Sequence, residues 1–455
     1  MLAIIIKFSA KHNILQERRY SRGMKNFYQV LVNTLIANVT TSFLWFCLTF
    51  WVYLETRSVL ATAIIGGAYM LFVSLTSIAF GTFVDHHKKK YVMQVSTLFA
   101  LTAFAIGGLI YLAIPKEDLL QLGGMWFWLF IIVVLAGSVV ENARNIALST
   151  TVTLLVPEAI RDRANGMVGT VNGISFLVTS VFSGLVIGFF GMGWALAIAV
   201  AMMTLAALHL VLFVRIPEVQ LAHDPELTKK VDIKGSIAAI RVVPGLAGLI
   251  FFTTFNNLLG GVFMALMDPY GLSLMSVQAW GLLWGALSTG FIVGGLFVSV
   301  KGLGKRPLFT LLAINVLMWI VCILFPLKSA ILPLAIGMFA YMCMIPFVEA
   351  VEQTIIQRVV PLKRQGRVFG FAQMIESASM PLMAFMIGPI AEFVIIPSMR
   401  QGGLLYQTVG PWFGTGEVRA IAMVFIIAGL VGLVMTLLAF MSRSYRMLSK
   451  HYADL

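Results

Sequence analysis

Twelve long apolar segments most strongly constrain the fold of this 455-residue chain. A helix needs about 20 mostly apolar residues to cross the ~30 Å hydrocarbon layer of a membrane. Segments of this kind cover residues 28–53, 59–84, 91–114, 125–148, 166–190, 194–214, 244–267, 277–300, 308–327, 331–352, 368–393 and 420–442. Backbone polar groups must pair within the segment when lipid surrounds it. The sequence therefore predicts an all-α membrane protein with twelve transmembrane helices.

The composition excludes the other broad classes of protein. Hydrophobic residues make up 60% of the chain and charged residues 11%, whereas a soluble domain is about 45–50% apolar and about 25% charged. Disorder requires low hydrophobicity. The net charge of +13 is better explained by basic loops that set membrane orientation than by a nucleic-acid partner, which we do not expect.

The basic residues give the predicted orientation. With the N-terminus in the cytoplasm, 26 of the 32 Lys and Arg residues fall in cytoplasmic segments and Arg144 lies within a span. The opposite loops hold only Arg57, Lys116, Lys328, Arg400 and Arg419. Because positive charge concentrates on the cytoplasmic side, we expect a multi-pass plasma-membrane protein with both termini in the cytoplasm. We expect it to be a monomer.

The spans divide into two sets of six around the longest polar stretch. We expect a cytoplasmic extension at 1–27, bundles at 28–214 and 244–442, a cytoplasmic linker at 215–243 and a tail at 443–455. The linker is interpreted as a solvated tether, with a binding segment as the alternative. The apolar run near the N-terminus is too short for a secretory signal peptide, and Met24 is a candidate alternative start.

The two halves resemble each other. TTVTLLVPEAIRDRANG in the first half is similar to QTIIQRVVPLKRQGRVFG in the second, which aligns Pro157 with Pro361, Arg163 with Arg367 and Gly166 with Gly370. GTFVDHHKKK likewise aligns with GLFVSVKGLGKR, with Gly81 on Gly295. Such duplications are typical of secondary transporters with a site at the interface of the repeats. Glycine pairs spaced by four, such as Gly169/Gly173, Gly184/Gly188 and Gly281/Gly285, predict closely packed helices there.

Ionisable residues inside the spans are the candidates for proton coupling, because burying them is costly and usually functional. Glu141 and Arg144 share a helix face. They form either a self-neutralised structural pair or a pair whose proton occupancy changes during transport. Glu376, with Asn172 as its repeat counterpart, is the other leading proton carrier, and Glu349 is the reserve. Glu352 is expected at the membrane interface.

Polar residues at helical spacing are the candidates for the substrate cavity. Asn38, Thr41 and Trp45 lie on one stripe of the first span, and Asn256 and Asn257 lie near the centre of the seventh. In lipid such a stripe must face protein or water. Hydrogen bonds between helices and contact with substrate remain the two alternatives for these side chains.

Several kinds of site have no signature in the sequence. The three cysteines show no metal-ligand or disulfide spacing. GLGKRP lacks the spacing of a nucleotide-binding P-loop, and no loop carries a catalytic constellation. We therefore expect no metal, no cofactor and no enzymatic activity.

The chain resembles the major facilitator superfamily. GTFVDHHKKK is similar to the family's loop motif G-x-L-a-D-R-x-G-R-K, with direct matches at Gly81, Asp85 and Lys90. LVPEAIRDRANG and the late segment from IIPSMRQGG to IAGLVGL look like the macrolide-efflux type of drug:proton antiporter. The resemblance implies a cytoplasmic gate that includes Gly81, Asp85 and Lys90. In this gate Asp85 lies near the start of the eleventh helix, with Arg163 and Arg367 as its basic partners.

Together these observations predict a proton-coupled exporter that moves amphipathic organic molecules such as drugs or macrolides by alternating access. Its partners would be a small-molecule substrate, protons and the lipid bilayer. A proton-coupled uptake symporter of the same fold is the alternative, and a non-transporting membrane receptor is a distant third.

Overall fold

The computed structural model describes residues 2–56, 59–217 and 233–455. In these ranges the chain forms helices and turns and no strand. Twelve helices are long and apolar enough to cross a membrane, which confirms the predicted count and the all-α class. They are α1 (Leu2–Thr56), α2 (Val59–His86), α3 (Lys89–Ala113), α5 (Met125–Leu155), α6 (Arg161–Phe189), α7 (Gly191–Leu212), α9 (Leu246–Leu274), α10 (Val277–Lys301), α11 (Pro307–Leu324), α12 (Ile331–Val359), α13 (Leu362–Ile390) and α17 (Glu417–Met441).

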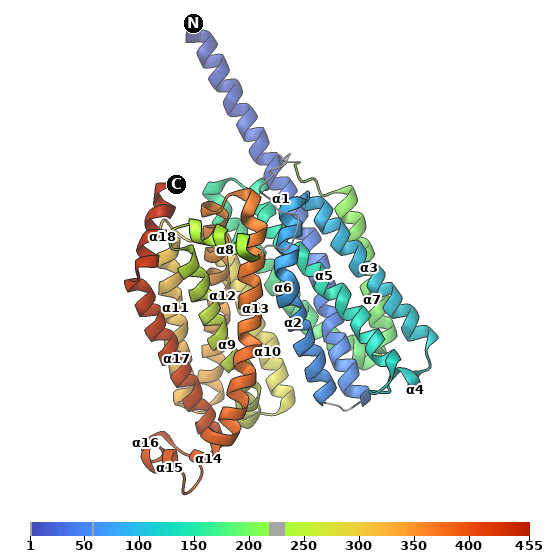
Figure 1. The fold of residues 1–455 in the computed structure, drawn as a ribbon, viewed down its shortest axis with the longest axis vertical. Helices are drawn as coiled ribbons and strands as arrows, with labels where there is room; N and C mark the ends of the chain where they lie inside the picture. The colour runs from blue at the N-terminus through green and yellow to red at the C-terminus, as the bar shows by residue number, and fades with distance from the viewer. Residues whose placement is uncertain (1, 57–58, 218–232) are drawn as a thin grey trace.

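The spanning helices form two groups (Figure 1). Helices α1 to α7 make up the N-terminal group, and α9 to α17 make up the C-terminal group. Both chain termini lie at one end of the molecule, which we call the terminal end, and the other is the distal end. Each group has its own aromatic core, around Trp51 and Phe130 in the first and around Tyr270 and Phe425 in the second.

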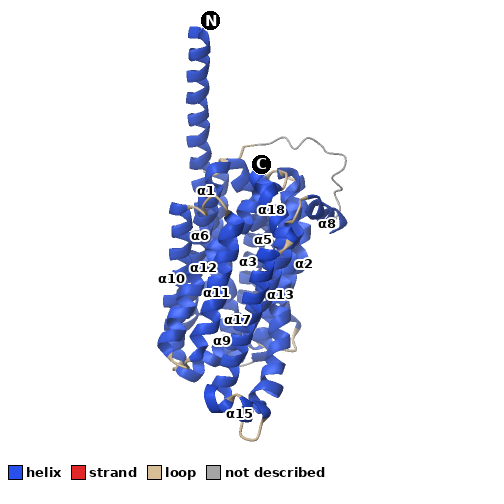
Figure 2. Cartoon of the chain, turned by 90° about the vertical axis from the view of Figure 1, so that its left-hand side faces the viewer, coloured by secondary structure: helices blue, strands red, loops and turns tan. Residues whose placement is uncertain are grey.

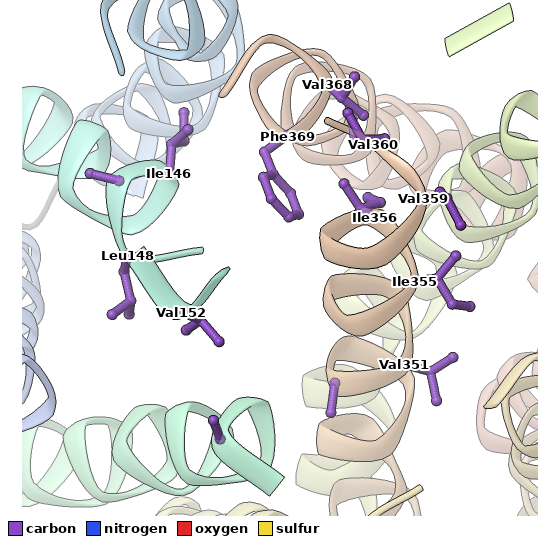
Figure 3. Close-up of a cluster of buried hydrophobic side chains, with 14 of the residues drawn as sticks. Ile146, Leu148, Val152, Val351, Ile355, Ile356, Val359, Val360, Val368 and Phe369 are labelled. Carbon is purple, nitrogen blue, oxygen red and sulfur yellow. The ribbon is translucent and has the colours of Figure 1, made fainter. Parts of the chain in front are cut away.

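A further apolar cluster joins the two groups. It combines side chains of α5 with side chains of α12 and α13. Figure 3 shows Ile146 and Val152 of α5 on one side, Ile356 of α12 on the other, and Phe369 of α13 between them. Buried apolar area contributes roughly 25 cal/mol per Å², so this cluster stabilises the contact between the groups.

The outer surface of the helices is apolar, as lipid contact requires. Leu109 and Leu112 of α3, Leu282 of α10 and Phe385 of α13 each expose more than half of their area. Patches of this extent are rare on soluble monomers. The described part of the chain is thus a membrane-embedded, multi-pass protein.

Short helices lie at both ends. At the distal end are α4 (Lys116–Leu119), α14 (Ile396–Ser398), α15 (Leu404–Thr408) and α16 (Gly410–Phe413), the last three protruding beyond the bundle (Figures 1 and 2). At the terminal end are α8 (Ile233–Val242) and α18 (Arg443–Asp454).

The last part of the predicted linker is not a solvated tether. Residues 218–232 lie outside the described residues, but the next ten form α8. Ser236, Ala239 and Ile240 of this helix are buried, because their spacing of three to four places them on one face. The expectation was therefore wrong for 233–242, and the five-part division of the chain remains a proposal.

Prolines distinguish the two groups. Pro269 interrupts α9, Pro346 interrupts α12, and Pro381 and Pro389 interrupt α13, whereas the sequences of α1, α2, α3, α5, α6 and α7 contain no proline. An internal proline removes one backbone hydrogen bond and tends to kink its helix.

Candidate transport cavity and gate

A cavity of about 700 Å³ lies between the two groups. Helices α2, α5 and α6 line it on one side, and α9 to α13 line it on the other. Its wall combines apolar and aromatic side chains with carboxamides; the aromatic ones are Tyr69, Phe291, Trp319, Tyr341 and Phe369. This volume lies in the range of small-molecule sites.

Three carboxyl groups line the cavity, all from the C-terminal group. Glu349 and Glu352 come from α12, and Glu376 comes from α13. The Thr253 hydroxyl donates a 2.6 Å hydrogen bond to Glu376 and lies 3.4 Å from Oε1 of Glu352. Glu352 and Glu376 are themselves within hydrogen-bonding range. Two carboxyl groups can share a hydrogen bond only when one carries a proton, so the cluster can hold and release protons.

Glu352 is the residue that the sequence analysis placed incorrectly. We expected it at the interface because the tenth span was predicted to end there, but α12 continues to Val359. Glu352 therefore lies inside the helix and lines the cavity. Its spacing of three from Glu349 would have indicated a shared face.

The two predicted asparagines of α9 also line the cavity. The Trp319 indole N–H donates to Oδ1 of Asn256 over 3.0 Å, and the Asn256 amide donates to its own helix. The Asn257 amide donates to the Thr253 carbonyl oxygen at 3.2 Å. Asn256 thus both accepts a hydrogen bond from another helix and lines the cavity, so the two alternatives hold together for this residue.

The polar stripe of the first span lies beside the cavity. Asn38 donates a 3.3 Å hydrogen bond to Asn172, which lines the cavity. Thr41 donates to carbonyl oxygens of its own helix, and Trp45 packs its ring 5.6 Å from that of Tyr69. None of the three predicted residues is part of the cavity lining, so their role in substrate binding remains a prediction.

Asp85, at the terminal end of α2, connects the two groups. Its Oδ1 accepts the backbone N–H of Gly366 at 2.7 Å, and its Oδ2 accepts that of Arg367 at 2.9 Å. These N–H groups lie in the second turn of α13, close to its N-terminus, where the helix dipole favours a negative charge. The Arg367 guanidinium adds an ion pair at 3.8 Å. Asp85 is buried, and its charge is balanced by these donors of the C-terminal group together with the nearby Lys89 of α3, in its own group.

Glycines allow the close approach that Asp85 needs. A Cβ atom at Gly81 would overlap the carbonyl oxygen of Gly366 and lie 3.1 Å from Cα of Gly370. Helices α2 and α13 are therefore in backbone contact near the terminal end.

Two residues that the resemblance assigned to the gate lie elsewhere. Lys90 donates to the carbonyl oxygens of Val214 and Val211, at the end of α7 in its own group. The expected pairing of Arg163 with Asp85 is not observed, because Arg163 lies in the first turn of α6, which packs against α10, whereas α2 packs against α13. Arg163 is exposed.

The Glu141–Arg144 pair is buried within the N-terminal group, away from the cavity lining. Arg144 forms an ion pair with Glu141 and donates to side chains of Asn33 and Thr97. Each nitrogen of the buried guanidinium thus has an acceptor, as buried charges require, whereas Oε2 of Glu141 is buried without a hydrogen-bond partner among the described residues. This geometry favours the structural alternative for Glu141, whose role in coupling remains a prediction.

The terminal end is closed by further contacts between the groups. Asn165 of α6 donates to Thr354 and Gln357 of α12, at 2.8 and 2.9 Å. Thr153 of α5 donates to Gln365 of α13 at 2.9 Å. The predicted close packing of Gly169 and Gly173 occurs further along α6, beside the cavity, against Pro346 and Phe291.

At the distal end, the helix pairs α2/α13 and α6/α10 are separated. A Cβ atom would meet no other heavy atom within 4 Å at seven glycines of α2, α6, α10 and α13, namely Gly66, Gly67, Gly184, Gly188, Gly281, Gly285 and Gly388. The expected tight packing at Gly184/Gly188 and Gly281/Gly285 is therefore wrong for this conformation. The structure represents a state closed at the terminal end.

Comparisons with known proteins agree with this architecture. The sequence profile of the Major Facilitator Superfamily matches residues 30–384. Macrolide efflux protein A of Streptococcus pyogenes is 22% identical over 382 residues, covering 80% of this chain and 89% of that protein. Among solved structures, a bacterial homologue of the iron transporter ferroportin in an outward-facing state has a TM-score of 0.64 at 14% identity, covering 92% of this chain and 100% of that one. The E. coli fucose:proton symporter also has a TM-score of 0.64, at 12% identity, covering 90% and 99%.

Proposed function

We propose that this chain, which belongs to the major facilitator superfamily, is a secondary transporter that exports amphipathic organic molecules in exchange for protons. The similarity to a macrolide efflux protein supports export. In this proposal the terminal end is cytoplasmic, both termini lie in the cytoplasm of the cell, and the described conformation faces outward.

The observation that carries the proposal is the composition of the cavity wall. Its large apolar and aromatic surface suits the apolar part of a drug-sized molecule. Its ionisable residues are three glutamates, and its lining contains no Lys, Arg or His. In a low-dielectric site this arrangement favours neutral or cationic substrates over anionic ones.

The carboxyl cluster is the proposed coupling site. In the outward-facing state Glu376, Glu352 and Glu349 are reached through the distal opening and take up protons. When the terminal end opens, the cluster releases a proton to the cytoplasm, and a substrate entering the cavity there competes for the same carboxyl oxygens. Proton and substrate thus occupy the cavity in alternation, which is the requirement for antiport.

The test is transport by the purified full chain in vesicles with an imposed pH gradient, using a cationic macrolide as the probe. Glu376→Gln should abolish gradient-driven uptake into inverted vesicles and leave substrate exchange, which needs no net proton movement, largely intact. Glu392→Gln, an exposed acid at the distal end, is the matched control and should transport normally. Full gradient-driven uptake by Glu376→Gln would contradict the role of this cluster.

The direction of transport separates the proposal from the uptake symporter. An antiporter accumulates the probe in inverted vesicles when protons leave them, whereas a symporter accumulates it when protons enter. The sign of the effective gradient therefore decides between the two functions.

A further inference from the structure

Asp85 is not the only acid that joins the two groups at the terminal end: Glu158, just before α6, pairs with Arg358 of α12 at 2.9 Å, and Asp162 makes a further contact. Asp162 lies in the first turn of α6. Its Oδ2 accepts the backbone N–H of Leu303, in the loop between α10 and α11, at 2.8 Å. Its Oδ1 accepts the N–H of Arg163, also at 2.8 Å. Both carboxylate oxygens are thus engaged, and one of them reaches the other group.

The loop is shaped to receive this carboxylate. Gly302 has φ +73°, in the left-handed region that side chains disfavour. A Cβ atom there would also overlap Oδ2 of Asp162. Glycine is therefore required at position 302 both by the backbone conformation and by the closeness of the acid.

The repeat reverses the positions of donor and acceptor. The alignment of the halves places Asp162 on Gly366 and Ser299 on Asp85. Around α13 the acid belongs to α2 and the N–H group to position 366. Around α6 the acid is Asp162 itself, at the position equivalent to 366, and the N–H group belongs to Leu303 in the loop after α10.

A difference of one helical turn in packing accounts for the reversal. Gly370 packs on Gly81. Its counterpart Gly166 packs on Ser299 instead: a Cβ atom added at Gly166 would lie 2.5 Å from the backbone nitrogen of Ser299. Ser299 is equivalent to residue 85, four positions beyond residue 81. Helix α6 therefore extends one turn further past α10 than α13 extends past α2, and Asp162 faces the loop beyond α10.

We propose that Asp162 is a second gate residue, which holds the terminal end closed by accepting the Leu303 N–H in parallel with Asp85. It is a positioning residue: it contacts neither the cavity nor the proposed carboxyl cluster. The inference rests on the proposed alternating-access function. Opening the terminal end separates α6 from the α10–α11 loop and must break this hydrogen bond.

The test measures the conformational equilibrium rather than transport. Ser377 lines the cavity, so in a background without Cys47, Cys322 and Cys343 a Ser377→Cys reporter can be labelled by an impermeant thiol reagent. Labelling in right-side-out and inverted vesicles gives the ratio of access from the two ends. The reporter chain is compared with Asp162→Ala, Asp162→Asn and the control Asp118→Asn, an exposed acid of α4.

Asp162→Ala should raise the ratio of terminal to distal access by about tenfold or more, because tenfold corresponds to ~1.4 kcal/mol and a hydrogen bond to a charged group contributes at least about that much. The access ratio of Asp162→Asn should lie between those of the reporter chain and Asp162→Ala, because the amide oxygen still accepts the Leu303 N–H. The ratio of Asp118→Asn should match that of the reporter chain. A merely structural role would lower the folded yield without moving this ratio. If Asp162→Ala folds poorly, the Asp162→Asn ratio decides.

An unchanged ratio in both Asp162 variants would overturn the inference. This outcome is distinct from failure of the proposed function, which would appear as no probe transport by the reporter chain. A shifted ratio without macrolide transport would uphold the second gate residue and refute only the substrate.

Discussion

Replacing Gly81 by alanine tests whether backbone contact between α2 and α13 sets the conformational equilibrium. The added methyl group would overlap the Gly366 carbonyl oxygen and lie 3.0 Å from the Gly366 carbonyl carbon and 3.1 Å from Cα of Gly370. All three are backbone atoms, so no side chain can rotate away. Gly67→Ala is the matched control, because it makes the same change on the same helix where a Cβ meets nothing within 4 Å.

The magnitude follows from the cost of overpacking. Forcing extra atoms into a packed interface typically costs about 1–3 kcal/mol. Because the clash exists only when the terminal end is closed, that cost shifts the equilibrium towards the terminally open state by about 5-fold to 150-fold. The gain in helix propensity from Gly to Ala, up to ~1 kcal/mol, is present in both states and cancels.

The assay is a distance measurement between spin labels at His87 and Lys305, which lie in exposed loops of the two groups at the terminal end. Gly81→Ala should add a population with a longer distance between the labels, and Gly67→Ala should not. The reasoning is refuted if both variants give the distance distribution of the unsubstituted protein, or if Gly67→Ala lengthens the distance as much as Gly81→Ala.

Two further predictions concern charged groups. Asp85→Asn should slow turnover while leaving membrane insertion intact, because an amide has one oxygen for the two N–H groups and each charge-assisted hydrogen bond contributes ~1.5–3 kcal/mol; a normal initial transport rate in vesicles would remove the gating role. Glu141→Gln should lower the thermal unfolding temperature in detergent, since it leaves Arg144 buried without its counter-charge at a cost of about 3–5 kcal/mol. An unchanged unfolding temperature together with lost gradient-driven transport would instead make Glu141 a proton carrier.

Fold class and span number were predictable because the membrane imposes a length on each apolar segment. The ends of the helices were not, because a hydropathy window loses its signal where a helix continues past the hydrocarbon layer. Glu352 shows the consequence: the last turns of α12 carry polar residues that face the other group rather than water. A span predicted to end at residue 352 therefore placed a cavity residue at the membrane surface.

The gate was predictable only in part. The loop motif identified Asp85, but the partners of Asp85 are two backbone N–H groups as well as a side chain. The resemblance placed Asp85 near the start of the eleventh helix, but a sequence motif does not specify which backbone N–H groups of that helix the carboxylate meets. The equivalence of Arg163 and Arg367 in the repeat also suggested equivalent roles, and the one-turn difference in packing, which sequence similarity does not record, makes their surroundings unlike.

The unequal distribution of internal prolines gives the two halves different bending stiffness. Three cavity-lining helices of the C-terminal group are interrupted by prolines, and those of the N-terminal group are not. Pro381 also leaves the carbonyl oxygen of Ser377, four residues earlier on the cavity wall, without its usual helical donor. The C-terminal group can therefore adapt its wall to molecules of different shape and offer them a backbone acceptor, while the N-terminal group moves as a stiffer body.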